Sequence, residues 1–395
     1  MGLGKLDVRI FSRELCTTIN KNMSMESKTE ASLRPILTAT IERILGLLNE
    51  DDNHQGLAVT PETSKKLNVL DLAHDTASLV RAHVTKLSLL VINRPVTLSA
   101  VNKVLNELAA GPIPSLFITK DLCIPEIYTS LISTELKFRT RRIISELQSL
   151  IIKLSSESQL LDDSLTNCSE NIRKDFLFVT GKVWDSCDSL MELRTLGIAG
   201  LLIRKAEEYR DLVKDALHEL QEWALEESDE EDSDEAQSGE EISTKIIHSF
   251  GSPRHVPDGD PTSIRPRIQV TTKKLRLTTL LFEAIIKRRL KTLPALPRIE
   301  IDAKPDKNPI KSVEIVHCLD CVLEMMKKIH DTTDDMVSSF YDLDVEQIDL
   351  GIEKCFSLAS KVSGILLNDW RGQQDPFSTW ALKFQSEMAV ERLPE

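Results

Sequence analysis

The chain has 395 residues, of which 41% are hydrophobic, so it can form two or three domains with sizeable cores and cannot be wholly disordered. Glycine occurs 14 times, proline 16 times, and aromatic residues make up 5%, a composition that favours helices over strands. The longest run without a polar side chain, residues 196–203, is too short to span a membrane. The seven scattered cysteines and the absence of an apolar secretory segment predict a soluble intracellular chain with reduced thiols.

The N-terminal half is predicted to form a helical bundle. Residues 1–30 show little amphipathic order, and we expect a poorly ordered extension there. Between residues 31 and 225, apolar residues recur three and four positions apart, most clearly over 67–91, 132–154, 172–190 and 202–223. This spacing places the apolar side chains on one face of each helix. We therefore predict an antiparallel bundle of about five helices over residues 31–225.

The net charge of −13 comes mostly from one segment. Residues 226–241 contain ten carboxylates and neither lysine nor arginine. The wider segment 226–270 also contains proline and glycine without apolar periodicity, which predicts an acidic disordered linker. Within it, acidic residues follow Ser228, Ser233 and Ser238 at one to three positions, so these serines are candidate phosphorylation sites.

The C-terminal part, residues 271–395, is predicted to be a second helical domain. Apolar stripes run over 277–293, 316–340 and 345–366, and only residues 264–270 and 298–301 resemble short strands. A basic cluster lies in the first stripe and consists of Lys287, Arg288, Arg289 and Lys291. It is either a nuclear-import or nucleic-acid signal, or the charged outer face of an amphipathic helix.

Local motifs for catalysis or cofactor binding are absent from the sequence, which has no P-loop, GxSxG elbow or HExxH. His317, Cys318 and Cys321 could begin a metal site if His330 or Cys355 joined them. One ligand pair within a continuous helix cannot supply four convergent ligands, so we favour reduced thiols that are buried or half-buried. The acidic pair at 334 and 335 diverges by about 100° on a helix, which favours solvated side chains over acid–base catalysis. We predict a non-enzymatic protein without a cofactor or metal.

Two sequence blocks resemble the cyclin-D-binding protein family (GCIP-like). The first is TGKVWDSCDSL, residues 180–190, and the second is TDDMVSSFYD, residues 333–342. The resemblance extends over roughly residues 67–380, and the residues that carry it are Trp184, Cys187, Asp188, Asp334, Asp335 and Tyr341. These side chains could be core and capping residues, or Trp184 and Tyr341 could anchor a partner surface.

The resemblance implies an all-α fold with an N-terminal bundle similar to those of vinculin and talin. It also implies a regulatory adaptor that binds cyclins or transcription regulators and negatively regulates the cell cycle, located in nucleus and cytoplasm. Membrane insertion and nucleic-acid binding are not expected. The alternative is a vinculin-like cytoskeletal or adhesion adaptor, because one architecture can serve both uses.

Overall fold

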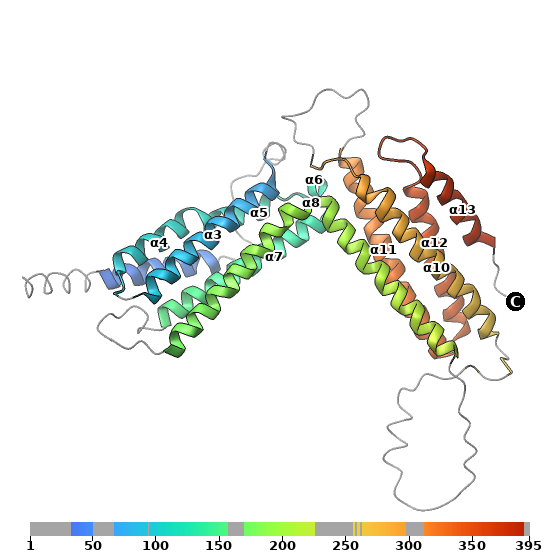
Figure 1. Cartoon of the computed structure of the whole chain (residues 1–395), viewed down its shortest axis with the longest axis horizontal. Coiled ribbons are helices and arrows are strands. Elements are labelled where there is room, and N and C mark those ends of the chain that lie inside the picture. Colours follow the sequence, from blue (N-terminus) through green and yellow to red (C-terminus); the bar gives the residue numbers. More distant parts are fainter. Residues whose placement is uncertain are drawn as a thin grey trace, which may run out of the picture. The chain divides into compact units, whose positions relative to one another are not determined.

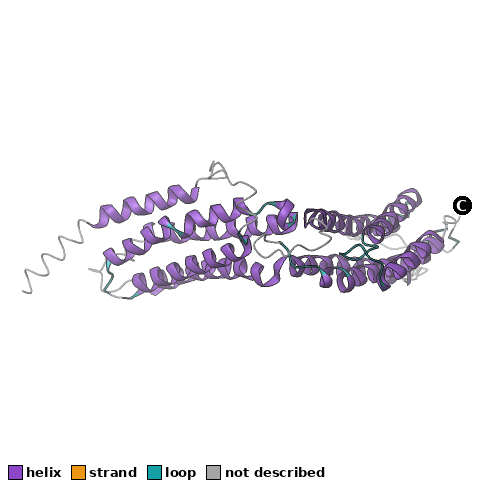
Figure 2. Cartoon of the chain, turned by 90° about the horizontal axis from the view of Figure 1, so that it is seen from above, coloured by secondary structure: helices purple, strands orange, loops and turns teal. Residues whose placement is uncertain are grey.

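The computed structural model describes residues 33–49, 67–93, 95–156, 170–225, 256, 259–260, 263–297 and 312–390. Within these ranges all regular structure is helical, which confirms the predicted all-α class (Figures 1 and 2). No helix in the same ranges is both long and apolar enough to cross a bilayer. The predicted extension over residues 1–30 and the candidate phosphorylation sites Ser228, Ser233 and Ser238 lie outside the described residues.

The described chain begins with a helix over residues 33–49. The helices that follow are α3 (Val69–Ile92), α4 (Leu98–Ala110), α5 (Pro112–Leu122), α6 (Pro125–Tyr128), α7 (Ser130–Ser156), α8 (Glu170–Leu225), α10 (Ile264–Arg288), the 3-10 helix η2 (Leu290–Thr292), α11 (Ser312–Tyr341), α12 (Val345–Ile365) and α13 (Pro376–Val390).

The chain divides into two compact units, and the division falls inside α8. The N-terminal unit contains the residues up to Ile124 and those from Ile132 to Gly197, whereas the C-terminal unit contains Pro125–Leu131 and nearly everything after Gly197. Gly197 has φ 59° and ψ −171°, a backbone conformation open essentially to glycine alone. The predicted end of the N-terminal bundle at residue 225 therefore differs from the observed division, because the amphipathic stripe continues across Gly197 into the second core.

The N-terminal unit packs α3 against α4, α5 and the first part of α8. The α3 stripe is fully buried, and its members are Ala73, Ala77, Val80, Val84, Leu87 and Val91. Contacts of Asp71 with Arg194, and of Ile92 with Arg173, show that α3 and α8 run antiparallel. The vinculin- or talin-like five-helix arrangement is not confirmed, and α4 and α5 in this unit are only 13 and 11 residues long.

The C-terminal unit is built from the rest of α8 with α6, α10, α11, α12 and α13. The buried face of its α8 segment follows the predicted stripe and contains Leu202, Ala206, Tyr209, Val213, Leu220 and Trp223. Helices α11 and α12 make the most extensive helix–helix contact in this unit. Two aspartates fix the backbone locally in this unit. Asp344 caps the start of α12, and Asp320 of α11 accepts hydrogen bonds from the backbone N–H and the hydroxyl of Ser130.

The strand prediction for residues 264–270 is wrong, because this segment is the first part of α10. Its alternation of apolar and polar residues resembles a strand, but Asp260 supplies a helix-start signal. The Asp260 carboxylate accepts hydrogen bonds from the backbone N–H groups of Ile264 and Arg265 at 2.6 and 2.9 Å. Pro266 is tolerated in the first helical turn, where its missing N–H costs nothing. Helix α10 thus begins inside the predicted linker of residues 226–270, most of which lies outside the described residues.

Candidate functional site

The first family-like block lies on the surface of the N-terminal unit, where α8 meets α3. Trp184 is half-buried, and the guanidinium of Arg81 lies 5.7 Å from the centre of its ring. Arg81 Nε also lies 3.1 Å from an Asp188 carboxylate oxygen, and both side chains are about half exposed. We call Arg81, Trp184 and Asp188 the Trp184 surface. It combines an aromatic ring with both signs of charge, which suits protein recognition.

Cys187 belongs to the core rather than to this surface. It is fully buried on the inner side of α8. Burial raises the pKa of the Cys187 thiol to about 12, and the nearby charge of Asp188 acts in the same direction. The thiol therefore stays protonated at neutral pH and acts as a small packing group.

The second family-like block lies on α11, in the C-terminal unit. Asp334 and Asp335 are exposed, as the solvated interpretation predicts. Asp334 lies 3.6 Å from His330 Nε2; partial burial raises the pKa of this carboxyl, and His330 opposes that rise. Tyr341 packs edge-to-face on Trp223 of α8, with ring centroids 5.3 Å apart. This aromatic pair anchors α8 to α11, so Tyr341 serves the packing of its own unit.

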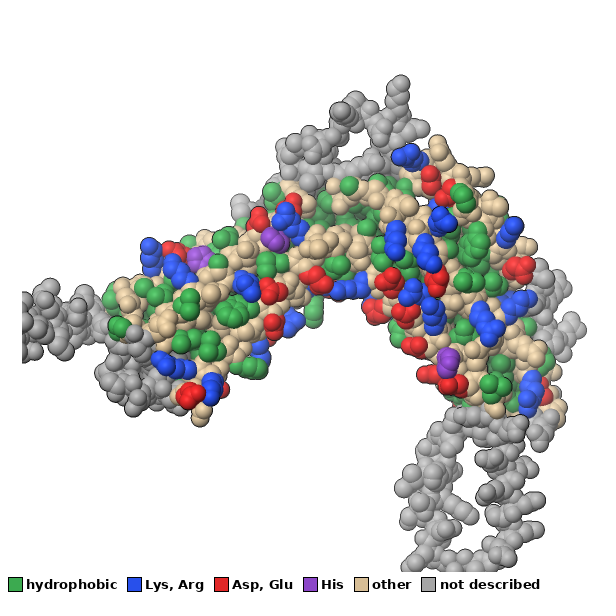
Figure 3. All heavy atoms as spheres, in the orientation of Figure 1, with side chains coloured by type: hydrophobic (Ala, Val, Ile, Leu, Met, Phe, Trp, Pro, Cys, Tyr) green, Lys and Arg blue, Asp and Glu red, His purple; other side chains and the backbone are tan. Residues whose placement is uncertain are grey.

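The basic cluster is divided by burial. Lys287, Arg288 and Lys291 are exposed, whereas the side chain of Arg289 is only 1% exposed. Arg289 therefore does not belong to an exposed import signal, because its guanidinium points into the protein. On the face seen in Figure 3, lysines and arginines are interspersed with acidic and apolar side chains.

Arg289 ties the end of α10 to the loop between α12 and α13. It donates to the carbonyls of Leu366 and Leu367 at 2.8 and 3.1 Å, and to both oxygens of Asp375 at 2.8 and 3.0 Å. Phe377 stacks on the guanidinium at 4.3 Å. Hydrogen bonds from Arg289 hold the pKa of the Asp375 carboxyl well below its ordinary range. Every face of this buried cation has a partner, so its role is structural.

The metal candidate forms only a pair of close ligands. His317 Nε2 and Cys321 Sγ lie 3.6 Å apart on successive turns of α11. Among the described residues, no group of three or more His, Cys, Asp or Glu side chains converges as a metal site would require. Cys355 is fully buried, and burial raises its thiol pKa to about 11. Cys318 and Cys321 are partly buried, as expected for half-buried thiols.

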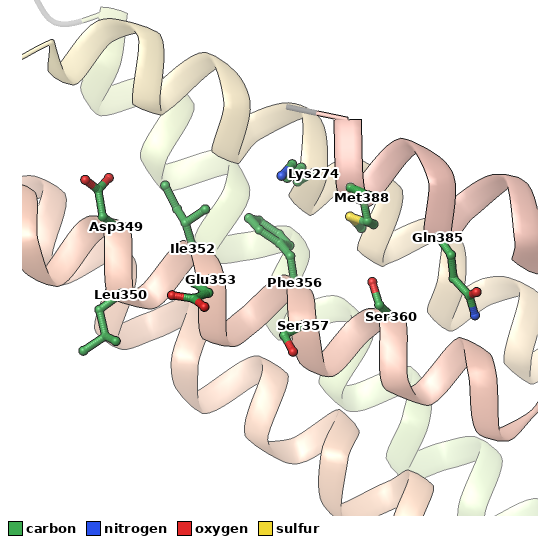
Figure 4. Close-up of a pocket in the computed structure, with 11 residues that line it drawn as sticks. Lys274, Asp349, Leu350, Ile352, Glu353, Phe356, Ser357, Ser360, Gln385 and Met388 are labelled. Atoms are coloured by element: carbon green, nitrogen blue, oxygen red, sulfur yellow. The ribbon is translucent and has the colours of Figure 1, made fainter. Parts of the chain in front are cut away.

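A groove of about 560 Å³ opens on the C-terminal unit between α10, α12 and α13 (Figure 4). Its apolar lining consists of Leu350, Ile352, Phe356 and Met388, and its polar lining includes Lys274, Asp349, Glu353 and Gln385. Leu350 is 56% exposed, whereas Phe356 and Met388 are almost buried. The groove thus has an apolar floor with a leucine on its open side.

Two of the charges at the groove already have partners. Arg267 binds both oxygens of Asp349 at 2.7 and 2.9 Å, and Lys274 Nζ lies 5.6 Å from the centre of the Phe356 ring. Glu353 is exposed, and no cation in the described ranges lies within ion-pair distance of it. Within the described part of the chain, the groove therefore has one carboxylate without a paired cation beside an apolar surface.

Sequence reasoning missed the buried cations that organise the unit. Three basic side chains are each less than 8% exposed, although the sequence places them in a basic stretch: Arg267, Lys274 and Arg289. Their partners Asp349, Phe356 and Asp375 lie about 80 residues along the chain, so no local pattern connects them. The one available signal was helical position, because Arg267 and Lys274 are seven residues apart and share one face of α10.

The comparisons with known proteins bear on the first of the two family-like blocks. Residues 73–226 match the family described as Grap2 and cyclin-D-interacting, N-terminal. That range contains the whole first block and the Trp184 surface. Over 280 residues the chain is 25% identical to a protein of Schizosaccharomyces pombe that is named as uncharacterized, and the match covers 69% of this chain and 75% of that protein. No solved structure matches the chain, so none supports the predicted likeness to vinculin or talin.

Proposed function

We propose that this chain, a member of the GCIP-like family through residues 73–226, is a non-enzymatic regulatory adaptor that binds a cyclin or a transcription regulator. Binding would negatively regulate cell-cycle progression or transcription by withholding the partner from other complexes. The observation that carries the proposal is the family match, whose description names interaction with cyclin D.

The Trp184 surface is our candidate contact region for that partner. It lies within the matched segment and presents an aromatic ring flanked by an exposed arginine and an exposed aspartate. Tryptophan and arginine are enriched among residues that dominate binding energy. Because the Arg81–Asp188 ion pair is exposed, breaking it so that either side chain can pair with a bound protein costs little free energy.

The experiment is affinity purification of the tagged chain from its native cells, with quantitative mass spectrometry. Wild type should enrich a cyclin or a transcription regulator, and Trp184→Ala should lower that enrichment at equal bait abundance. Leu382→Ala on α13 is the control, because it removes a large apolar side chain that is exposed and lies in the other unit. The proposal would be contradicted if folded wild-type bait enriched neither a cyclin nor a transcription regulator.

We propose that the chain works in both nucleus and cytoplasm. The exposed residues Lys287, Arg288 and Lys291 are a candidate import signal, with Arg289 left out because it is buried. Replacing these three by alanine should lower the nuclear fraction in live-cell imaging. Replacing the exposed Arg265 and Arg276 of the same helix should leave it unchanged. Equal distributions for all variants would remove the import role.

A further inference from the structure

The groove on the C-terminal unit lies where helix α13 ends and helices α10 and α12 continue. Helices α10 and α12 run parallel, since Arg267 pairs with Asp349 near their starts and Arg289 binds Leu366 near their ends. Helix α13 runs back along them, with Ser378 bonded to Leu367 and Gln385 bonded to Ser363. Met388 and Ala389, next to the end of α13, lie in the groove lining.

The part of the seam between α10 and α12 that no described helix covers has the length of a short helix. Helix α12 continues beyond the end of α13 over residues 345–356, and α10 over residues 264–274. At a rise of 1.5 Å per residue these stretches are about 15 to 17 Å long, or about three helical turns. A third helix laid in line with α13 would fill the seam between α10 and α12, in the way that α13 fills it further along.

The charged side chains at the groove determine which residues a docked helix would need. Arg267 neutralises Asp349, and the Lys274 ammonium is positioned over Phe356. Among the described residues no cation pairs with the Glu353 carboxylate in the groove, and Glu346 adds an exposed carboxylate in the first turn of α12. A docked helix needs an apolar stripe against Leu350, Phe356 and Met388, and a lysine or arginine opposite Glu353.

We propose that this groove binds an amphipathic, basic helix of about three turns from a partner protein, seated end to end with α13 between α10 and α12. This deepens the proposed adaptor function, on which it rests. The groove lies in the C-terminal unit and the Trp184 surface in the N-terminal unit, so an adaptor could present both. Docking would bury Leu350, which is 56% exposed in the unbound chain.

The test uses a phage-displayed library of 14-residue peptides selected on the full-length chain. Library positions would allow Leu, Ile, Met or Phe at helical spacing, with Ala, Gln, Glu or Lys elsewhere. The enriched peptides should contain lysine in excess of glutamate, and fluorescence anisotropy should show binding weakened about tenfold or more by Leu350→Glu. Glu353→Lys should abolish the preference for lysine.

Two substitutions serve as matched controls. Leu382→Glu changes an equally exposed leucine on the face of α13 outside the groove, and Glu219→Lys reverses an exposed charge on α8. Both should leave peptide affinity within about twofold. Because Leu350 and Glu353 are also exposed, circular dichroism should show all four variants folded.

Several outcomes would overturn the inference. Enriched peptides that bind Leu350→Glu as well as wild type, or that prefer glutamate, would place binding elsewhere. Peptides that bind only after deletion of residues 391–395 would assign the groove to the chain's own end, and dimerisation lost in Leu350→Glu would assign it to a second copy. Failure of the groove would leave cyclin enrichment by the same chain intact, so the two proposals fail separately.

Discussion

Two arginines, one in each unit, are paired with an aspartate and an aromatic ring, but at opposite depths. Arg81 lies 3.1 Å from Asp188 and 5.7 Å from the Trp184 ring, with 45% of its side chain exposed. Arg289 lies 2.8 Å from Asp375 and 4.3 Å from the Phe377 ring, with 1% exposed. The same three chemical groups thus form a surface in one unit and an internal tie in the other.

The two sets differ in energy because water reaches one ion pair and is largely excluded from the other. An exposed ion pair contributes about 0 to 1 kcal/mol, because water screens both charges and competes for them. Removing one partner of a buried pair costs about 3 to 5 kcal/mol, because the remaining charge loses both its partner and its hydration. The exposed set can therefore exchange partners during binding, whereas the buried set fixes the loop on which α13, one wall of the groove, depends.

The largest expected effect comes from Arg289→Ala, which should lower the free energy of unfolding by about 3 to 5 kcal/mol. The substitution leaves the Asp375 carboxylate, which is 28% exposed, without its cation, and it removes the donors from the buried carbonyl of Leu366 and the partly buried carbonyl of Leu367. Urea denaturation followed by tryptophan fluorescence measures the change. Arg288→Ala is the control, since its exposed side chain should matter by less than about 0.5 kcal/mol. Equal losses for both would contradict the burial contrast.

The next largest effect is the pH-dependent contribution of the Asp375 carboxylate to stability. Asp375→Asn should cost about 1.5 to 3 kcal/mol at neutral pH, because it removes charge-assisted hydrogen bonds to Arg289. The folded-state pKa of Asp375 lies below its unfolded value of about 3.9, so the unfolded chain takes up the proton first as pH falls.

The stabilisation from Asp375 should therefore be complete above about pH 4 and decline below it. Urea titrations of both proteins from pH 7 to pH 3 should show a gap between wild type and Asp375→Asn that is constant at first and narrows below about pH 4. A gap that widened on acidification would mean that the carboxylate is not stabilised by Arg289.

Trp184→Ala should have an intermediate effect on stability, about 1 to 2 kcal/mol, because the ring is only half-buried. Phe176→Ala provides the comparison on the same helix, where a fully buried ring should cost about 3 to 5 kcal/mol. Thermal unfolding of the two variants measures both. If they lost equal stability, Trp184 would be a core residue and the Trp184 surface would lose its anchor.

Arg81→Ala should have the smallest effect, about 0 to 1 kcal/mol, and the loss should shrink as salt is added. The measurement is urea denaturation at low and at high ionic strength. A loss comparable with that of Arg289→Ala, or one insensitive to salt, would show that the two arginines play the same role.

The helical framework could be predicted because it depends on local periodicity. The stripe at Ile132, Leu136, Ile143, Leu147, Leu150 and Leu154 is completely buried in the structure. Apolar residues three and four apart can reach one core only from a helix, so the sequence alone determines which face is buried. Cys187 and the aspartates at 334 and 335 follow the same rule, one inside and two outside.

Long-range partners could not be predicted in this way. Arg289 has the sequence context of an exposed basic cluster, and its burial depends on Asp375 and Phe377, 86 and 88 residues later. The groove is likewise a product of packing, because it depends on where α13 ends relative to α10 and α12. Residues 264–270 show the same limit locally, because their alternation resembles a strand although the Asp260 carboxylate accepts hydrogen bonds from the first N–H groups of a helix.

Isothermal titration calorimetry of the purified full-length chain against the cyclins of its own organism, D-type first, tests the central claim most directly. We expect saturable binding by wild type and an affinity about tenfold lower for Trp184→Ala, with Leu382→Ala equal to wild type. The account would be contradicted if the folded chain gave no binding heat with any cyclin, nor with any transcription regulator that co-purifies with it.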